Sequence, residues 1–73
     1  MEKVVIIKED FIRLDSFLKL CGAAGTGGQA KLLILDEHVS VNGEICTMRG
    51  KKIHPEDKVL FDGDIYVCNK AGV

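Results

Sequence analysis

The hydrophobic pattern of the first third of the chain predicts a strand followed by a helix. Lys3–Lys8 (KVVIIK) is a run of β-branched residues bounded by charge, which is typical of a strand. A stripe at helical spacing follows, formed by Leu14, Phe17, Leu18 and Cys21. This spacing predicts an amphipathic helix that starts at about Arg13, and Gly22 directly after it is well placed to end the helix.

A second helix is predicted shortly afterwards. Thr26 and Gln29 have the spacing of a capping box, in which the hydroxyl accepts from a backbone N–H and the glutamine side chain returns to the cap. The apolar face of this helix consists of Ala30, Leu33 and Ile34. The polar residues 36–38 end the pattern, and the short connection makes the two helices expected neighbours.

After residue 38 the apolar positions alternate, which predicts short strands. The expected strands are residues 39–41, 44–46, 58–61 and 65–67. Asn42-Gly43 is a strong signal for a tight hairpin, and Asp62–Asp64 marks a second turn. The predicted fold class is α+β, with two short helices packed against a small, mainly antiparallel sheet.

Length and composition indicate a single domain over residues 1–73. No apolar run approaches the roughly 18 residues of a membrane span, and Glu9 and Asp10 stand where a signal peptide needs small residues. We therefore expect a cytoplasmic protein without a membrane segment. The cysteines are Cys21, Cys46 and Cys68. They have no C-x-x-C spacing, which favours free thiols, with one disulfide pair as the alternative.

Residues that could carry catalysis are sparse. His38 and His54 lie in polar stretches, and no motif positions a carboxylate beside them, which favours solvated loop residues over a general base. Asp62 and Asp64 fall short of the ligand set of a calcium loop. The motifs of nucleotide-binding loops and hydrolase elbows are absent. The sequence predicts a protein that is not an enzyme and uses no metal ion or cofactor.

Positive charge is concentrated in the middle of the chain, although the net charge is −1. Residues 19–52 contain the basic residues Lys19, Lys31, Arg49, Lys51 and Lys52 and the acidic residues Asp36, Glu37 and Glu44. Three of these basic residues fall in RGKK, the start of a polar stretch, RGKKIHPED, that we expect to be a loop. Segregation of this kind gives a nearly neutral protein a basic face, which attracts phosphates.

The start of the second helix is unusual because Gly27 and Gly28 lower its helix propensity, by about 1 kcal/mol each relative to alanine. Lys31 in the first turn also opposes the helix dipole. A phosphate bound by the free N–H groups of residues 27–29 would explain both features. The alternative is that the glycines relieve crowding between the helices and that Lys31 is solvated.

The order RLDSFLKLCG, TGGQAKLLI, VSVNGE, RGKKI and two strands around DGD resembles a small RNA-binding domain. This is the domain first known from the ribosomal small-subunit protein S-four. The resemblance covers roughly residues 13–67 and is strongest to the stand-alone bacterial members of the YaaA/YbcJ type. It implies an αL-type RNA-binding motif, in which two helices backed by a twisted sheet present their joint to RNA.

By position, the resemblance implies RNA contacts from the start of each helix and from the basic loop. The implied RNA-binding residues are Arg13, Thr26, Gly27, Gly28, Gln29, Lys31, Arg49, Lys51 and Lys52. Asn42 and Gly43 are expected to shape the hairpin instead. The implied partner is structured RNA, ribosomal or transfer RNA, recognised through its phosphate backbone and shape, with ribosomal or RNA-processing proteins as further partners.

A second function class stays open at this point. Many members of the family have an arginine where this chain has Gly27, and this chain is slightly acidic overall. Both features favour a protein-interaction adaptor that keeps the fold without tight RNA binding. Salt dependence separates the two functions, since phosphate binding weakens steeply with salt and apolar docking does not.

Overall fold

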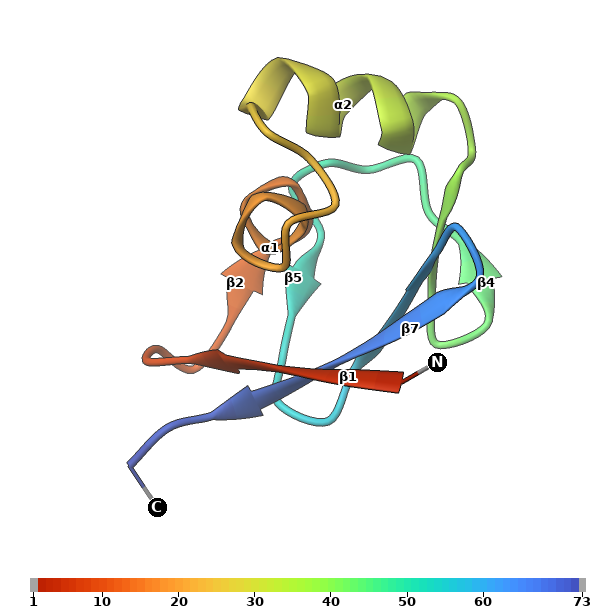
Figure 1. Cartoon of the computed structure of the whole chain (residues 1–73). Helices are drawn as coiled ribbons and strands as arrows, with labels where there is room; N and C mark the ends of the chain where they lie inside the picture. Colours follow the sequence, from red (N-terminus) through yellow and green to blue (C-terminus); the bar gives the residue numbers. More distant parts are fainter. Residues whose placement is uncertain (1, 73) are drawn as a thin grey trace.

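The computed structural model describes residues 2–72, and its elements are shown in Figure 1. In chain order they are β1 (Glu2–Ile7), β2 (Ile12–Arg13), α1 (Leu14–Leu20), α2 (Gly27–Leu35), β3 (Val39–Val41), β4 (Glu44–Ile45), β5 (Lys52–Ile53), β6 (Lys58–Phe61) and β7 (Asp64–Lys70). Five strands form one sheet in the order β1-β7-β6-β3-β4, and β2 pairs with β5. Only the β1–β7 pair within residues 2–72 is parallel, so the predicted α+β class with a mainly antiparallel sheet is confirmed.

The core lies between the sheet and the two helices, which occupy the same side of it (Figure 1). Alternate residues of the long strands face this core, including Val5, Ile7, Val59, Tyr66 and Cys68. From the helices come Leu14, Phe17, Leu18, Ala30 and Ile34, each with no exposed surface. The helical stripes read from the sequence are therefore confirmed, except that Leu33 and Cys21 are half-buried at the margin of the core.

Each helix ends at a residue in the left-handed region of backbone conformation. Gly22 has a φ of 85° and follows α1 as expected, and its N–H donates to the Lys19 carbonyl. After α2 the same position is taken by Glu37, with a φ of 63°. The Glu37 N–H donates to the Ile34 carbonyl and the His38 N–H donates to the Leu33 carbonyl, the two bonds of a Schellman motif. A residue with a β-carbon is strained in this conformation.

Glu37→Gly is therefore expected to increase the free energy of unfolding by about 0.5–1 kcal/mol, because glycine adopts the left-handed conformation without strain. Urea unfolding followed by circular dichroism measures the change. Glu37→Ala removes the same carboxylate but keeps the strain, so it serves as the control. Equal stability of the two variants would show that the effect comes from charge and not from the backbone.

The hairpin between β3 and β4 turns at Asn42 and Gly43, whose φ values are 51° and 87°. Asn42 also holds the turn that precedes β6. Its Nδ2 donates to Asp57 Oδ1 at 3.1 Å, and its Oδ1 accepts from the Lys58 N–H at 2.9 Å. The expected structural role of Asn42 is confirmed by these contacts.

The stretch RGKKIHPED was predicted to be a loop, and this prediction is wrong at Lys52–Ile53, which form β5. Ile53 is fully buried and its strand pairs with β2. Burial of this one apolar residue therefore holds the middle of an otherwise polar segment against the core. The last strand, β7, is also longer than predicted. It pairs with the whole length of β1, from Glu2 opposite Ile65 to Ile7 opposite Lys70.

The cysteines are free thiols, as expected. Cys46 and Cys68 are buried and Cys21 is half-buried, and burial raises the pKa of the Cys21 and Cys68 thiols. Within residues 2–72, neither helix has the length and apolar character to cross a bilayer. The same residues contain no cluster of three or more His, Cys, Asp or Glu side chains arranged to hold a metal ion.

Candidate functional site

The start of α1 holds the basic segment 48–52 in place. The Leu14 N–H donates to the Lys51 carbonyl at 2.8 Å, and the Asp15 N–H donates to the Arg49 carbonyl at 3.1 Å. The first N–H groups of a helix have no acceptor within the helix, so these two carbonyls satisfy them. The start of α1 is therefore not a vacant anion site, and its donors instead fix the backbone that carries Arg49, Lys51 and Lys52.

The short β2–β5 ladder then places two positive side chains directly opposite each other. Arg13 pairs with Lys52, and Ile12 pairs with Ile53. Like charges at opposed positions of a ladder repel and destabilise it. Asp15 offsets this in part, since its Oδ2 lies 3.1 Å from Arg13 Nη2, yet the Arg13 side chain stays 54% exposed. An anion placed between Arg13 and Lys52 would remove the remaining repulsion.

Two aromatic rings share this face of the ladder, and the sequence analysis did not assign them to the site. Lys52 Nζ lies 4.9 Å from the centre of the Phe11 ring, and the Phe11 and His54 ring centres are 5.9 Å apart. Side chains of successive residues in an extended chain point to opposite faces, so the two neighbours of a residue that faces the core share the other face. Phe11 and Arg13 are the neighbours of Ile12, and Lys52 and His54 are the neighbours of Ile53. We call Phe11, Arg13, Lys52 and His54 the Arg13–Lys52 patch.

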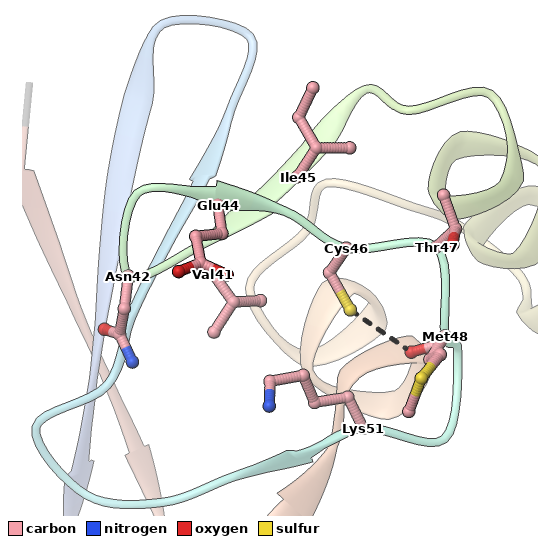
Figure 2. A pocket seen from close by; sticks show the side chains of 8 residues that line it. All are labelled: Val41, Asn42, Glu44, Ile45, Cys46, Thr47, Met48 and Lys51. Carbon is pink, nitrogen blue, oxygen red and sulfur yellow. Dashed lines mark hydrogen bonds between the residues drawn. The ribbon is translucent and has the colours of Figure 1, made fainter.

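Lys51 does not belong to this patch. It lines a hollow of about 410 Å³ between the β3–β4 hairpin and the segment that leads to β5. Figure 2 shows its side chain directed into this hollow, on the side of Val41 and Asn42. Successive residues of an extended chain point in opposite directions. The structure thus separates the side chains of Lys51 and Lys52, which the sequence had grouped as one basic cluster.

The start of α2 is capped by side chains in a way that differs slightly from the prediction. Thr26 Oγ1 accepts from the Gln29 N–H at 3.1 Å, as expected. Gln29 Oε1 accepts from the Gly25 N–H at 2.7 Å, one residue before the cap, and not from Thr26. The expectation of a free N–H at Gln29 is therefore wrong. The N–H groups of Gly27 and Gly28 are left without an acceptor among residues 2–72.

Crowding does not explain the two glycines. A β-carbon added at Gly27 would have no atom within 4 Å, and one at Gly28 would meet only Thr26 Oγ1 at 4.0 Å. Neither glycine lies in the left-handed region within this structure. Packing and backbone conformation would both accept alanine here, so the interpretation that the glycines relieve helix crowding is wrong.

The predicted residues therefore fall into three places. Arg13, Arg49 and Lys52 are attached to the start of α1 by the β2–β5 ladder and the two backbone hydrogen bonds. The start of α2 carries Thr26, Gly27, Gly28, Gln29 and Lys31, all exposed. Lys51 lies apart in the hollow. In Figure 1, α1, the start of α2 and the chain that enters β5 lie toward the same side of the molecule.

Comparisons with known proteins agree with this architecture. A family model described as the S4 domain matches residues 5–68, which include both helix starts and the basic segment. The chain is also 35% identical over 63 residues to a Bacillus subtilis (strain 168) protein described as "Probable ribosome maturation protein RlbA". That match covers 86% of this chain and 89% of the relative. The chain belongs to the S4 domain family.

Proposed function

We propose that this protein is a non-enzymatic, cytoplasmic RNA-binding protein that recognises structured RNA through phosphate and shape contacts. The observation that carries this proposal is the opposed pair Arg13 and Lys52. A folded protein that places two cations against each other gains when a phosphate lies between them. Arg49 adds charge on the same anchored segment.

The start of α2 is the second proposed contact region. Gly27 and Gly28 leave unsatisfied N–H groups at a helix N-terminus, where the dipole favours an anion. Lys31 is the fifth residue of α2, one position beyond the first turn in which it was predicted, and contributes positive charge. In this proposal, Thr26 and Gln29 shape the helix start through their caps, and Lys51 supplies only long-range attraction.

The relatives and the surface support a particular class of RNA. Membership of the S4 domain family and a relative named for ribosome maturation support ribosomal RNA, with transfer RNA as the other candidate. Double-stranded RNA is recognised mainly by shape and by its backbone, because its deep, narrow major groove hides the base edges from side chains. A compact group of cations suits this mode of binding.

Binding to ribosomal RNA fragments and to transfer RNA should be measured between about 50 and 200 mM salt. Each phosphate contact contributes about 0.7–0.9 to the slope of log affinity against log salt, so three contacts from Arg13, Arg49 and Lys52 predict a fall of about 20- to 40-fold. Preference between the two RNA classes identifies the target. Affinity that is independent of salt would contradict phosphate binding.

A protein-interaction adaptor is the second candidate function. Ile45 and Met48 line the hollow of Figure 2 and are 59% and 64% exposed, which is high for apolar side chains on a small domain. A ribosomal or RNA-processing protein could dock on these side chains. Ile45→Ser would weaken such an association and leave RNA affinity unchanged, which separates this function from the first.

Gly27→Val tests the start of α2. We expect the free energy of unfolding to change by less than about 0.5 kcal/mol, since a β-carbon at Gly27 meets no atom within 4 Å. RNA affinity should fall by about 3- to 10-fold, because the branched side chain keeps a phosphate away from the exposed N–H groups. Urea unfolding and RNA titration measure the two effects, with Leu32→Val on the exposed side of α2 as the control. Unchanged affinity in the folded Gly27 variant would remove this region from the proposed interface.

A further inference from the structure

β1 forms one edge of the main sheet, and nothing within residues 2–72 pairs with its outer side. The opposite edge is β4, which has two residues, whereas β1 has six. Val4 and Ile6 of β1 are 59% and 52% exposed. A long edge strand with exposed apolar side chains is a template for pairing with another strand.

The hydrogen bonds of β1 show which of its residues direct their backbone N–H and C=O groups away from the sheet. The Ile7 carbonyl accepts from the Ala71 N–H at 2.8 Å, on the side of β7. Because successive residues of a strand direct their N–H and C=O groups to opposite sides, those of Val5 also face β7. The N–H and C=O groups of Val4 and Ile6 therefore face outward and are available to a further strand.

The residues of this edge are complementary to themselves in the antiparallel direction. With Val5 opposite Val5 of a second copy, Val4 lies opposite Ile6 of the second copy, and Glu2 lies opposite its Lys8, the first residue after β1. Val4 and Ile6 would then exchange both backbone hydrogen bonds, and each end of the ladder would gain a Glu–Lys pair. A register centred on Val4 or on Ile6 instead leaves Glu2 or Lys8 against an apolar residue.

The helix side of this edge is also open. A hollow of about 320 Å³ lies beside β1 and is bounded on the helix side by Leu20 and Cys21. Leu20 ends α1 and is 53% exposed. The two-fold axis of the antiparallel pair would bring Leu20 of both copies onto the same side of the joined sheet, where they would cover the new pair of strands.

We infer that β1 pairs antiparallel with β1 of a second copy of this chain, so that the two five-stranded sheets form one continuous sheet. Val5 lies on the two-fold axis, and the Glu2–Lys8 pairs at both ends select this register. The contact is small, so the dimer is weak and depends on protein concentration. This inference is independent of the proposed RNA site, since it uses none of the residues of the Arg13–Lys52 patch.

Sedimentation equilibrium between about 10 µM and 1 mM protein tests the pairing, with a monomer–dimer equilibrium as the expected result. Glu2→Lys and Lys8→Glu each place like charges opposite each other and should weaken the dimer by about 5- to 20-fold. The double variant Glu2→Lys/Lys8→Glu restores opposite charges and should return the dissociation constant to within about 2-fold of the starting value. Both positions are exposed, so circular dichroism should show the same fold for all three variants.

Hydrogen exchange supplies the independent readout of register. Slower exchange of the Val4 and Ile6 amides at high protein concentration is the expected result, with no concentration effect at the Ile45 amide of β4. A monomer at every concentration would overturn the inference. So would a dimer whose Val4 and Ile6 amides stay unprotected, or single charge changes that the double variant does not correct.

Discussion

Arg13→Gln together with Lys52→Gln is expected to lower RNA affinity by about 10- to 100-fold at about 100 mM salt. Each substitution removes one cation, and with it one phosphate contact, from the proposed interface, and counterion release makes such a contact worth about 5- to 8-fold in affinity at about 0.1 M salt. Glutamine keeps much of the aliphatic stem of each side chain. The slope of log affinity against log salt should fall by about 1.4–1.8, which a titration at several salt concentrations measures.

Stability should change little. Arg13 and Lys52 are opposed in the β2–β5 ladder, and relief of their repulsion is worth about 0.2–1 kcal/mol in the free protein. Loss of the Arg13–Asp15 pair and of the contact between Lys52 and the Phe11 ring costs a similar amount. The double variant should therefore be about as stable as the parent protein. A loss of RNA affinity without a loss of stability is the behaviour of a binding site, and it would not result from damage to the fold.

Lys51→Gln is the matched control, because it removes the same charge from the adjacent residue. The Lys51 side chain lies in the hollow beside Val41 and Asn42, away from the Arg13–Lys52 patch. We expect a reduction in affinity of less than about 3-fold, from the loss of long-range attraction alone. If Lys51→Gln weakens binding as much as the double variant does, RNA crosses the hollow and the proposed interface is misplaced.

Local patterns were sufficient to predict most of the fold. The helical stripe of α1, the hydroxyl cap at Thr26 and the Asn42-Gly43 turn all depend on contacts within a few residues, which the sequence displays directly. The predicted strands also exist, with boundaries that shift by a few residues. A helix or strand can be predicted from local sequence wherever the spacing of its apolar residues repeats more than once.

The β2–β5 ladder could not be predicted in this way, and the Arg13–Lys52 patch depends on it. Each strand has two residues, too few for a period to be recognised, and the pairing joins positions 12–13 to positions 52–53. Its cause is also non-local, since the start of α1 needs acceptors and the Arg49 and Lys51 carbonyls supply them. Phe11 and Lys52 come together only because the start of α1 binds the segment that carries Lys52.

The sequence left two explanations for Gly27 and Gly28, and only the space around them could separate these. The open surroundings of both positions exclude crowding as the explanation. What is left is a helix start with exposed N–H groups and a lower intrinsic stability than alanine would give. This loss of helix stability agrees with a binding role, because residues that are unfavourable for the local secondary structure occur most often at functional sites.

Phe17→Ala is expected to reduce the free energy of unfolding by about 3–5 kcal/mol, the range for removal of a buried aromatic side chain. Phe17 has no exposed surface and is among the largest fully buried side chains of the domain. A chain of 73 residues has a total stability of only about 4–11 kcal/mol. The urea midpoint of the variant should therefore fall by at least about a quarter of its starting value.

Leu32→Ala gives the comparison for this change, since Leu32 is a helical residue that is 61% exposed. Its truncation should cost less than about 0.5 kcal/mol. The contrast also bears on function, because α1 carries the N–H groups that hold the basic segment, and Phe17 anchors α1 in the core. RNA binding by the Phe17 variant should therefore fall in parallel with its folded fraction. Full RNA affinity in an unfolded Phe17→Ala chain would show that binding needs only the charges and not the anchored ladder.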